Sequence, residues 1–553
     1  MKKLYTLFLL SCSILFAADA DIRLSSIGFT PEMSKKVSVT AECEQFTLVD
    51  ANTGETAYTG TLSDPVYQKD VDQSVRIADF TLFVDPGWYI LNIENVGQSV
   101  PFEIGADVCA FPYTTAMRAF YLWRCGTAVS GDHKGDHFEH DACHLNDALK
   151  DALGRPGQRR DGTGGWHDAG DYGKYVTNGA FTLGCLFLAW DHFQNKLESV
   201  ELDLPETAPG YPDFLKELKW ETDWLLKMPY PDGSGRVSHK LTRLNFSGMI
   251  MPENDDAERY FTDWSTTAVA DFAAVMAMAA RYFAPLDSAY ADTCLQAALS
   301  SYQALRDHPQ HKRFQQGDFH TGAYASDDRD DRLWAAAELW ETTGDSSYLH
   351  DFEQQVRNSQ PRMRPGMAQA SEKRHVDFDW DWGNLRNLGV FTYVLSEQTG
   401  RDPELLQTLH KHLQLTADDI VETADRDVYG RTLGERYQWG CNGSVARQTI
   451  TLYTAYLLFH NKDYVRAASD AVAHLFGRNV YNRSYVTGLG HNPPMNPHSR
   501  RSVADDVQAP WPGYIVGGGH SATDWVDVHE SYQTNEIAVN WQAALVYALA
   551  IFL

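Results

Sequence analysis

Two carboxylates three residues apart, Asp168 and Asp171, lie in the stretch Gly-Gly-Trp-His-Asp-Ala-Gly-Asp-Tyr-Gly-Lys-Tyr-Val over residues 164–176. If the turn tightens into the start of a helix, these positions share a face, and the small Ala169 and Gly170 let another molecule approach the backbone. Like charges this close resist joint ionisation, so we expect at least one displaced pKa, as in a site that activates water. The alternative is that Asp168 caps a helix and Asp171 is a solvated first-turn acid.

Glu536 is a third acid of interest, because it directly precedes an apolar stretch over residues 537–547 that predicts a buried helix. Desolvation at the point where a loop enters a buried helix would raise the pKa of this carboxyl. The carboxyl would then stay protonated, as a general acid requires. The alternative is a first-turn glutamate that the helix dipole stabilises.

His498 and Arg500 end a loop over residues 484–500 that holds three prolines and two glycines. Prolines hold an irregular backbone rigid, so such a loop presents its side chains with fixed geometry. Both side chains donate hydrogen bonds, which the hydroxyl groups of a sugar accept. The alternative is that Arg500 only neutralises nearby acids.

Cys125, Cys143, His144 and His167 supply two thiolates and two imidazoles, a set that suits tetrahedral zinc. A closed site with four protein ligands is structural. This one would connect the loop that runs from Cys125 to His144 with the loop that carries the two aspartates. His140 is an alternative fourth ligand. The other interpretation is a set of unpaired buried thiols and surface histidines.

A run of acids over residues 327–331, Asp-Asp-Arg-Asp-Asp, precedes a predicted helix. Carboxylates are hard oxygen ligands, so the run would suit calcium. The same stretch would also serve as an acidic helix start that the dipole favours.

Residues 1–20 predict a signal peptide, because two lysines precede an apolar run over residues 4–16 and Ala18, Asp19 and Ala20 offer an A-x-A cleavage site. We therefore expect a secreted or periplasmic protein. Leu-Leu-Ser-Cys at 9–12 suggests a weaker alternative, a lipoprotein anchored at Cys12. The apolar run is too short to span a bilayer, and no later run reaches about 18 residues, so we expect no transmembrane segment. An odd number of cysteines follows Cys12, which does not indicate a disulfide framework.

The composition is that of a globular protein with more than one domain. The chain has 553 residues, of which 43% are hydrophobic and 12% aromatic. The formal net charge of -27 would repel nucleic acid and acidic membranes, so we expect neither as a partner. Aromatic side chains suit the flat apolar faces of sugar rings, and a neutral substrate fits best. We expect a monomer.

Short alternating runs at 22–24, 36–39, 46–49, 80–83 and 88–91, with turn residues between them, predict a small β-sandwich over residues 21–105, immunoglobulin-like in broad class. From about residue 112 the period changes to that of helices. Examples of predicted helices are 213–226, 266–283, 331–342, 388–398, 447–459 and 464–476. Helix after helix without intervening strands indicates an all-α domain over 112–553, in which helical hairpins close into a ring.

These stretches together resemble glycoside hydrolase family 9, the cellulase family with an all-α barrel of six helical hairpins. The loop 484–500 fits the family's histidine-containing signature at each defined position. Residues 525–543 fit the second signature, which includes Asp527, Tyr532, Glu536 and Ala538, and depart from it where Gln542 replaces the usual Asn. The aspartate pair is the third hallmark. The predicted sandwich resembles the immunoglobulin-like module of one branch of the family.

The resemblance implies that Asp171 is the general base, that Asp168 helps to hold the attacking water, and that Glu536 is the general acid. His498 and Arg500 would bind the sugar beside the scissile bond. The family inverts the anomeric centre, which needs room for a water molecule between base and sugar. The carboxyl groups of Asp171 and Glu536 should therefore stand about 6.5–9.5 Å apart.

The resemblance also implies metal ligands and a set of aromatic residues that form the floor of the cleft. Tyr532, Trp439 and Trp166 are candidates for aromatic residues that contact the sugar, with Tyr532 inside the signature. Family members with the immunoglobulin-like module often hold a zinc at the cysteine and histidine set. Members also bind calcium around a loop that matches the acidic run, which makes the predicted calcium ligands Ser326, Asp327, Asp330 and Asp331.

The function that this sequence predicts is an exported, inverting endo-1,4-β-glucanase acting on cellulose-type glucans. An alternative is an exo-acting cellodextrinase or exo-β-glucosaminidase, with the segment 130–140 as a loop that closes one end of the cleft. A third possibility of another class is a catalytically silent glycan-binding protein. The sequence ends seventeen residues after Glu536, so we expect no cellulose-binding module beyond the barrel.

Overall fold

The computed structural model describes residues 19–147, 149–151, 155–206, 210–359 and 373–553. The predicted signal peptide over residues 1–20, Cys12 included, lies outside the described residues except for its last two positions. Among the helices that the structure describes, none combines the length and the apolar character that a bilayer crossing needs. The described cysteines are all free thiols, which agrees with the expectation of no disulfide framework.

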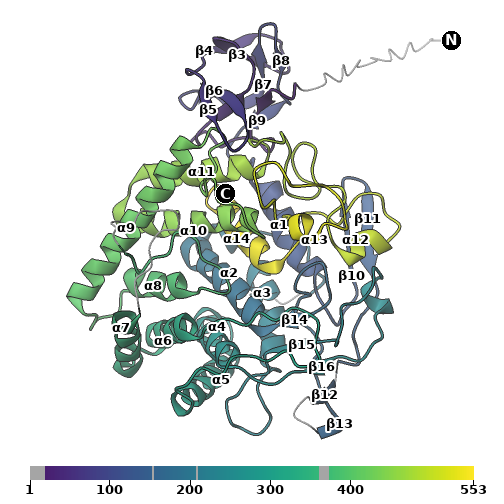
Figure 1. Cartoon of the computed structure of the whole chain (residues 1–553), viewed down its shortest axis with the longest axis vertical. Helices are drawn as coiled ribbons and strands as arrows, with labels where there is room; N and C mark the ends of the chain where they lie inside the picture. Colours follow the sequence, from purple (N-terminus) through teal and green to yellow (C-terminus); the bar gives the residue numbers. More distant parts are fainter. Residues whose placement is uncertain (1–18, 148, 152–154, 207–209, 360–372) are drawn as a thin grey trace, which may run out of the picture.

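Two small antiparallel sheets form the β-sandwich at the top of Figure 1, which confirms the immunoglobulin-like prediction. One sheet has the order β1-β2-β6-β5 and the other β4-β3-β7-β8, with β9 also paired to β7. The strands are β1 (Ile22–Arg23), β2 (Lys36–Val39), β3 (Gln45–Asp50), β4 (Thr56–Thr61), β5 (Val66–Gln68), β6 (Gln73–Asp79), β7 (Gly87–Ile93), β8 (Gly97–Gln98) and β9 (Phe102–Ile104).

The core of the sandwich is aromatic. Phe29, Phe46, Phe80 and Phe102 are buried, and their ring centroids lie 5.6 to 6.3 Å apart in the closest pairs. The prediction of a strand over residues 80–83 is wrong, because these residues turn after β6. The apolar pattern there has another cause: the Phe80 side chain fills the sandwich core from the turn.

Six helices form a closed inner ring that the other helices surround. The ring order is α2, α4, α6, α8, α10 and α14, and α14 packs back on α2. The inner helices are α2 (Val176–Leu197), α4 (Thr266–Phe283), α6 (Arg329–Thr343), α8 (Arg386–Leu395), α10 (Cys441–Phe459) and α14 (Val539–Ala550). Around them lie α3 (Asp213–Leu225), α5 (Ser288–Asp307), α7 (Ser346–Asn358), α9 (Pro403–Arg426), α11 (Lys462–Leu475) and α1 (Ala110–Leu122). Six inner–outer pairs make the predicted (α/α)6 barrel.

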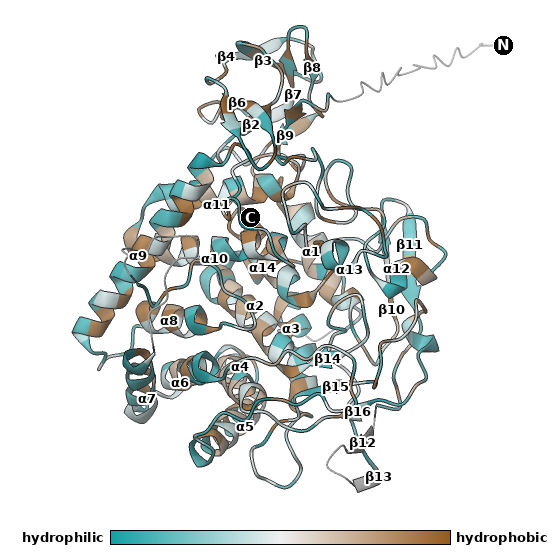
Figure 2. Ribbon diagram, viewed as in Figure 1, coloured by the Kyte–Doolittle hydropathy of each residue, from teal (hydrophilic) through white to brown (hydrophobic). Residues whose placement is uncertain are grey.

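Sequence patterning decides which helix is inner and which is outer. Every residue of α14 is buried, and α4 is buried without a break from Thr266 to Ala280, so these helices are enclosed on all sides. Outer helix α9 instead buries Leu405, Leu409 and Leu413 on one stripe and turns polar residues outward, as its mixed colours in Figure 2 show. Inner and outer helices therefore carry different patterns of apolar residues.

The barrel also carries short strands that the sequence analysis did not predict. A hairpin pairs β10 (Val129–His133) with β11 (Asp136–His140). A five-stranded sheet has the order β13-β12-β16-β15-β14, with β12 (Leu149–Asp151), β13 (Arg155–Arg160), β14 (Lys174–Tyr175), β15 (Lys240–Thr242) and β16 (Tyr260–Phe261). The expectation of helices without intervening strands is wrong here. The remaining short helices are η1 (Pro252–Asn254), α12 (Arg500–Ala504) and α13 (Tyr532–Asn535).

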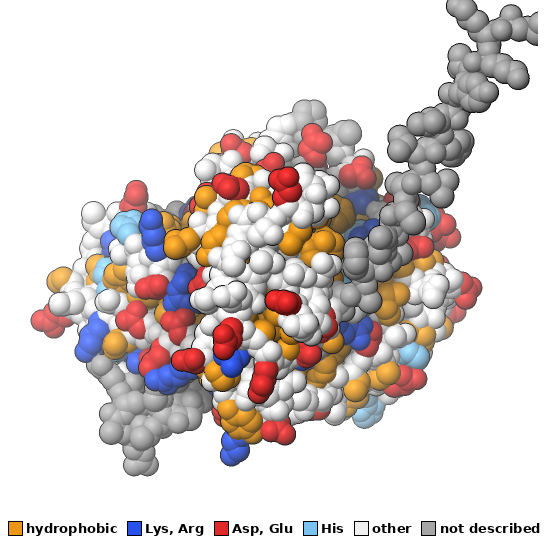
Figure 3. All heavy atoms as spheres, turned by 90° about the horizontal axis from the view of Figure 1, so that it is seen from above, with side chains coloured by type: hydrophobic (Ala, Val, Ile, Leu, Met, Phe, Trp, Pro, Cys, Tyr) orange, Lys and Arg blue, Asp and Glu red, His pale blue; other side chains and the backbone are white. Residues whose placement is uncertain are grey.

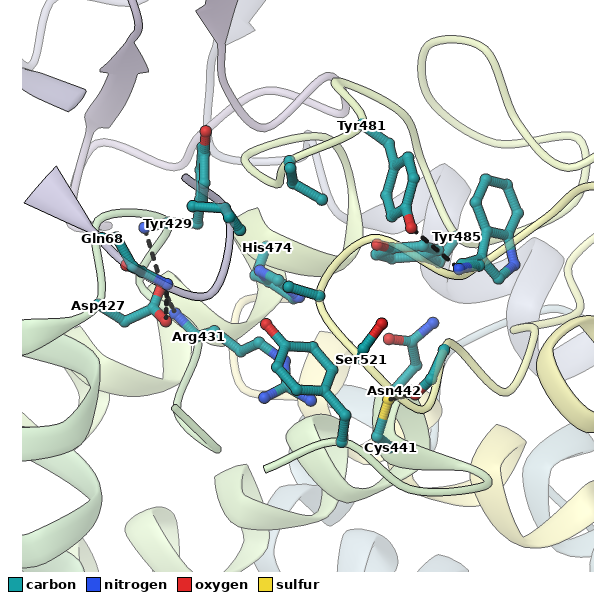
Figure 4. A pocket seen from close by; sticks show the side chains of 16 residues that line it. Gln68, Asp427, Tyr429, Arg431, Cys441, Asn442, His474, Tyr481, Tyr485 and Ser521 are labelled. Carbon is teal, nitrogen blue, oxygen red and sulfur yellow. Dashed lines mark hydrogen bonds between the residues drawn. The ribbon is translucent and has the colours of Figure 1, made fainter. Parts of the chain in front are cut away.

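The sandwich contacts the barrel through side chains that bond the loop after α9. Gln68 donates from Nε2 to Asp427 Oδ2 at 3.1 Å and accepts from the Val428 N–H at 2.9 Å. Tyr437 donates to Asp70 Oδ2 at 3.0 Å. Figure 4 shows Gln68 beside Asp427, at the edge of a cavity of about 20 Å³ between the two domains, which has room for a water molecule.

Acidic side chains are scattered over the face of the molecule seen from above in Figure 3 and do not gather in one patch. The net charge of -27 belongs to the whole chain, and no part of the face seen there concentrates it. It gives the surface a general repulsion toward polyanions rather than a local binding site.

Candidate active site

Asp168, Asp171 and Glu536 line one cavity of about 670 Å³. The two aspartates precede α2 and the glutamate precedes α14, which are neighbours in the inner ring. The chain leading into other inner helices lines the same cavity with Tyr324 before α6, Trp382 before α8 and Trp439 before α10. The cavity therefore lies where the chain enters the inner helices, and Asp171 and Glu536, 365 positions apart in the sequence (536 − 171), meet because the ring closes there.

Backbone bonds join the aspartate segment to the glutamate segment. Ala169 pairs with Ala538 in an isolated antiparallel bridge, and the Val539 N–H donates to Asp168 O at 2.9 Å. Glu536 in turn forms a parallel bridge with His498. Because these contacts involve main-chain atoms, the relative positions of the acids are fixed by the fold.

Gly170 is required for a different reason from the one predicted. A Cβ at this position would lie 2.1 Å from His498 O, so the small residue admits the histidine loop and not a second molecule. The Arg500 N–H donates to Gly170 O at 3.1 Å and completes this contact. The aspartates do not share a helix turn either, since α2 begins at Val176 and its N-cap, Tyr175, makes no side-chain cap. The helix-capping alternative for Asp168 is therefore wrong.

Asp168 is held by two hydrogen-bond donors. Asn178 donates to Oδ1 and the Tyr324 hydroxyl to Oδ2, each at 2.7 Å. Burial, reinforced by the neighbouring charge of Asp171, raises the pKa of Asp168 to about 8. Asp171 itself accepts from the Gly173 N–H at 2.8 Å. The pair cannot carry two charges without cost, and a shared water or proton is the chemistry that this arrangement favours.

Glu536 has the properties of a proton donor. Burial, and after it the charges of Asp171 and Asp168, raises the pKa of this carboxyl well above its usual value of 4.5. The side chain still opens onto the cavity. A carboxylic acid that keeps its proton and faces a cavity is equipped for general acid catalysis.

His498 and Arg500 are both brought to the cavity wall. His498 donates from Nδ1 to His529 O at 2.6 Å, so its Nε2 stays available to a ligand. Arg500 donates from Nη1 to Gly170 O at 2.8 Å and from Nε to Ser247 O at 3.2 Å. These hydrogen bonds hold the His498 and Arg500 side chains in place beside the acids.

Two of the three predicted aromatic residues line the cavity. Trp439 and Tyr532 are about half exposed and lie edge to face, with ring centroids 6.2 Å apart. Trp166 is buried, donates to Glu217 Oε1 at 2.8 Å and belongs to the core. The hairpin over residues 130–140 does not line this cavity, and its closing of one end of the cleft stays a prediction.

Cys125, Cys143, His144 and His167 also come together, with one ligand atom of each within 4.8 Å of the others. Cys125 Sγ lies 3.5 Å from His144 Nδ1, and Cys143 Sγ lies 3.8 Å from His167 Nε2. Zinc bonds of about 2.0–2.3 Å at tetrahedral angles place ligand atoms roughly 3.5–3.8 Å apart, so the donors fit this ion. His140 bonds Asp141 O through Nδ1 and is not in the set.

Comparison with known proteins decides the family. Residues 112–549 match the family model for glycosyl hydrolase family 9, and residues 17–98 match that for the cellulase N-terminal ig-like domain. This chain belongs to glycosyl hydrolase family 9. Membership in a family of hydrolases confirms the prediction of an enzyme and goes against the alternative of a catalytically silent glycan-binding protein.

Relatives and solved structures of family 9 align with almost the whole chain. Endoglucanase D of Acetivibrio thermocellus is 53% identical over 97% of this chain and 83% of its own length. A xyloglucan-specific endo-beta-1,4-glucanase of Bacteroides ovatus is 31% identical over 95% and 92%. The crystal structure of a Zn-binding triple mutant of a family 9 endoglucanase superposes with a TM-score of 0.86 at 33% identity, covering 95% of this chain and 99% of that one.

Several cavity residues of this family 9 chain were missed by sequence analysis. Tyr324 holds Asp168, and Trp382 packs edge to face on Tyr324 with centroids 4.8 Å apart. Trp382 belongs to Asp-Trp-Asp-Trp at 379–382, where alternating acids and tryptophans before a helix are a signal for a sugar site. Asn178, inside a helix, gave no such signal.

Asp255 supports the cysteine and histidine cluster and was not predicted. Its Oδ2 lies 3.4 Å from His144 Nε2, and Arg243 bonds its other oxygen. A histidine that binds metal through one ring nitrogen usually donates from the other to such a carboxylate, which fixes the ring.

The four residues predicted to bind calcium are not brought together as one ligand set. Asp327 pairs with Arg329 at 2.6 Å, and Asp330 accepts from the Leu385 N–H at 2.7 Å. Asp331 lies against buried Asp271, and burial raises its pKa well above the usual value. Ser326 Oγ is buried without a hydrogen-bond partner. Calcium binding at this loop stays a prediction.

Proposed function

We propose that this family 9 chain is an inverting endo-1,4-β-glucanase that cleaves cellulose-type glucans. The observation that carries the proposal is the meeting of Asp168, Asp171 and Glu536 in one cavity lined with aromatic side chains. An endoglucanase at 53% identity supports the substrate class and the endo mode of attack.

Glu536 supplies the acid half of the reaction. As the bond between the anomeric carbon and the glycosidic oxygen breaks, the carboxyl gives its proton to that oxygen, and the new chain end leaves as an alcohol. The raised pKa favours the protonated form of Glu536, which a general acid needs. His498 Nε2 and the Arg500 guanidinium bind hydroxyl groups of the sugar beside this bond.

Asp171 supplies the base half. It takes a proton from a water molecule whose oxygen bonds to the anomeric carbon from the face opposite the leaving group, which inverts the configuration. Asp168, fixed by Asn178 and Tyr324, orients that water. The mechanism requires the separation of about 6.5–9.5 Å between the Asp171 and Glu536 carboxyl groups that inverting enzymes share.

Trp439 and Tyr532 are proposed to stack on sugar rings along the cleft. Their exposed faces are apolar, and the uncharged ring of a glucan loses little hydration there. A neutral glucan also avoids the repulsion that a surface of net charge -27 exerts on acidic polymers.

We propose that Cys125, Cys143, His144 and His167 hold a structural zinc ion. Burial lowers the pKa of His167 to about 3, so its imidazole is neutral and can offer a lone pair. When bound, the ion supplies four strong bonds between the loop at Cys125 and the loop of the aspartates, and all four positions are filled by protein. The Zn-binding mutant among the similar structures supports the identity of the metal.

Export and domain boundaries complete the proposal. The signal peptide over residues 1–20 would direct the chain out of the cytoplasm. Outside the cytoplasm the enzyme would meet polymeric glucans. The sandwich is assigned to residues 21–105 and the barrel to 112–553, and the family matches at 17–98 and 112–549 support this division.

Hydrolysis of carboxymethylcellulose by the wild type and by Glu536→Gln tests the function. We expect the wild type to lower viscosity much faster than it releases reducing ends, and the variant to do neither. Cellohexaose and chitosan oligomers serve as further substrates. Release of only terminal units would indicate exo action, and equal activity of both proteins would refute the role of Glu536.

A further inference from the structure

Lys240 in β15 is a buried ammonium group beside the active site. The residue has no exposed surface, and no carboxylate of the described residues pairs with it within 4.0 Å. Its Nζ donates instead to Gln316 Oε1 at 2.7 Å, Thr321 Oγ1 at 2.9 Å and Gly322 O at 2.6 Å. A buried charge without an ion-pair partner costs free energy, so its presence calls for a reason.

Three aromatic rings surround this ammonium. The ring centroids of Tyr175, Phe314 and Phe319 lie 5.7, 5.4 and 5.1 Å from Nζ, within the range of cation–π attraction. Burial lowers the pKa of Lys240 to about 7, and the negative charge of Asp171 opposes this effect. At the acidic to neutral pH of a glucanase assay the group is therefore substantially charged.

Lys240 is connected to both aspartates through the segment that it bonds. The Gly322 N–H donates to the Tyr175 hydroxyl at 3.0 Å, and this hydroxyl lies 3.5 Å from Asp171 Oδ2. Two residues later, Tyr324 donates to Asp168. Lys240 and Tyr175 are also paired directly in the β14–β15 ladder. By holding Thr321 and Gly322, the ammonium fixes the partners of both carboxylates.

We propose that Lys240 is a positioning residue. Its ammonium holds Thr321 and Gly322, and through this segment it orients Tyr175 beside Asp171 and Tyr324 on Asp168. The inference rests on the proposed function, in which Asp171 must be ionised to accept a proton.

The other charged groups around Asp171 do not replace this one. Arg500 donates to the carbonyls of Gly170 and Ser247, and burial lowers the pKa of His498, which favours its neutral form. Below the cavity, Arg243 bonds Asp255, and Arg259 pairs with Asp147 at 3.4 Å. Arg500, like Lys240, has neutral partners, but among these cations Lys240 is the one that bonds Thr321 and Gly322.

The test measures kcat and KM on cellohexaose for the wild type, Lys240→Met and Lys240→Arg. We expect kcat of Lys240→Met to fall about tenfold to a hundredfold at the pH optimum, because Tyr175 and Tyr324 are no longer held in place. KM should change little, because Lys240 does not line the cavity. Lys240→Arg keeps a charged donor and should retain more of the wild-type kcat than Lys240→Met.

Lys35 offers a matched control. It is also fully buried, and its Nζ donates to Pro31 O and Met33 O within the sandwich. Lys35→Met should lose stability but keep the wild-type kcat. If Lys240→Met does not fold, Lys240→Gln, which keeps a donor, carries the same test.

The outcomes separate this inference from the proposed function. Absence of glucan hydrolysis by the wild type would refute the function. Hydrolysis by the wild type together with a wild-type kcat in folded Lys240→Met would leave the function standing and overturn the inference. A fall in kcat that Lys240→Arg does not share, at unchanged KM, would support it.

Discussion

The acid site and the cysteine and histidine cluster meet at two adjacent residues, Asp168 and His167. Burial shifts the pKa values of these two residues in opposite directions. Burial raises the pKa of Asp168 to about 8 and so favours an acid that keeps its proton. Burial lowers the pKa of His167 to about 3 and so favours a neutral base with a free lone pair. One buried segment therefore prepares a proton-transfer site on one side and a metal site on the other, because burial always disfavours the charged form.

The two sites also differ in what holds them. The acids are joined by main-chain bonds between segments before α2 and α14. The cluster joins its loops by side chains, with backbone help from the Cys125 N–H to Gly165 O at 2.7 Å and the His167 N–H to Trp123 O at 2.9 Å. Changes at the acids should thus affect chemistry and spare the fold, and changes at the cluster should do the reverse.

The largest effect should come from Asp171→Asn and Glu536→Gln. Each removes one proton transfer, and we expect kcat on carboxymethylcellulose to fall at least a thousandfold, about 4 kcal/mol in activation free energy. Far-UV and near-UV circular dichroism should stay unchanged. A variant of either kind that retains a tenth of the wild-type kcat would contradict the assignment.

Cys125→Ser should show the opposite balance. Loss of one thiolate should remove the metal and lower the free energy of unfolding by about 2–4 kcal/mol, while kcat of the folded fraction falls far less than in the acid variants. Metal analysis by mass spectrometry should give about one zinc per wild-type chain and none in the variant. Cys294→Ser, which changes a buried thiol in α5 outside the cluster, is the control. Equal zinc in both variants would disprove the cluster as a zinc site.

Asp255→Asn should sharpen the contrast with a smaller change. The variant keeps all four ligands but weakens the acceptor at His144 Nε2, so zinc affinity should fall about 10- to 100-fold. Competition with a chromogenic chelator measures this. We expect kcat of the zinc-loaded variant to stay within about twofold of the wild type. An unchanged affinity would mean that Asp255 only pairs with Arg243.

Sequence patterns predicted the parts of the site whose residue types carry the chemistry. The aspartate pair, Glu536 and the four members of the cysteine and histidine cluster could be found because their side chains are the ones that transfer protons or bind metals. The partners that tune them, Asn178 and Lys240, could not, since a polar residue in a helix and a lysine in a strand have many uses. The closing role of residues 130–140 stays a prediction, because the hairpin contacts Gly488 and Trp511 and does not line the cavity at the acids.

The smallest effect concerns stability and shows the cost of an acid that stays protonated. The folded state raises the pKa of Glu536 above its unfolded value of 4.5, so its contribution to stability is fully present below about pH 4.5 and is lost as pH rises toward the folded pKa. Each pH unit in this window costs the wild type up to about 1.4 kcal/mol, an upper bound because the carboxyl opens onto the solvent-filled cavity.

Glu536→Gln removes this titration, so its free energy of unfolding should exceed that of the wild type by an amount that grows from pH 4.5 to pH 7. Urea unfolding followed by tryptophan fluorescence at several pH values measures the difference. Exposed Glu198→Gln is the control and should show a gap that does not grow with pH. The two kinds of variant should change the free energy of unfolding in opposite directions. Cys125→Ser should lower it at every pH. Glu536→Gln should raise it, because the buried carboxyl of Glu536 serves function at the expense of stability. A gap that shrinks as pH rises would mean that the fold favours the charged glutamate, which would leave it unfit as the general acid.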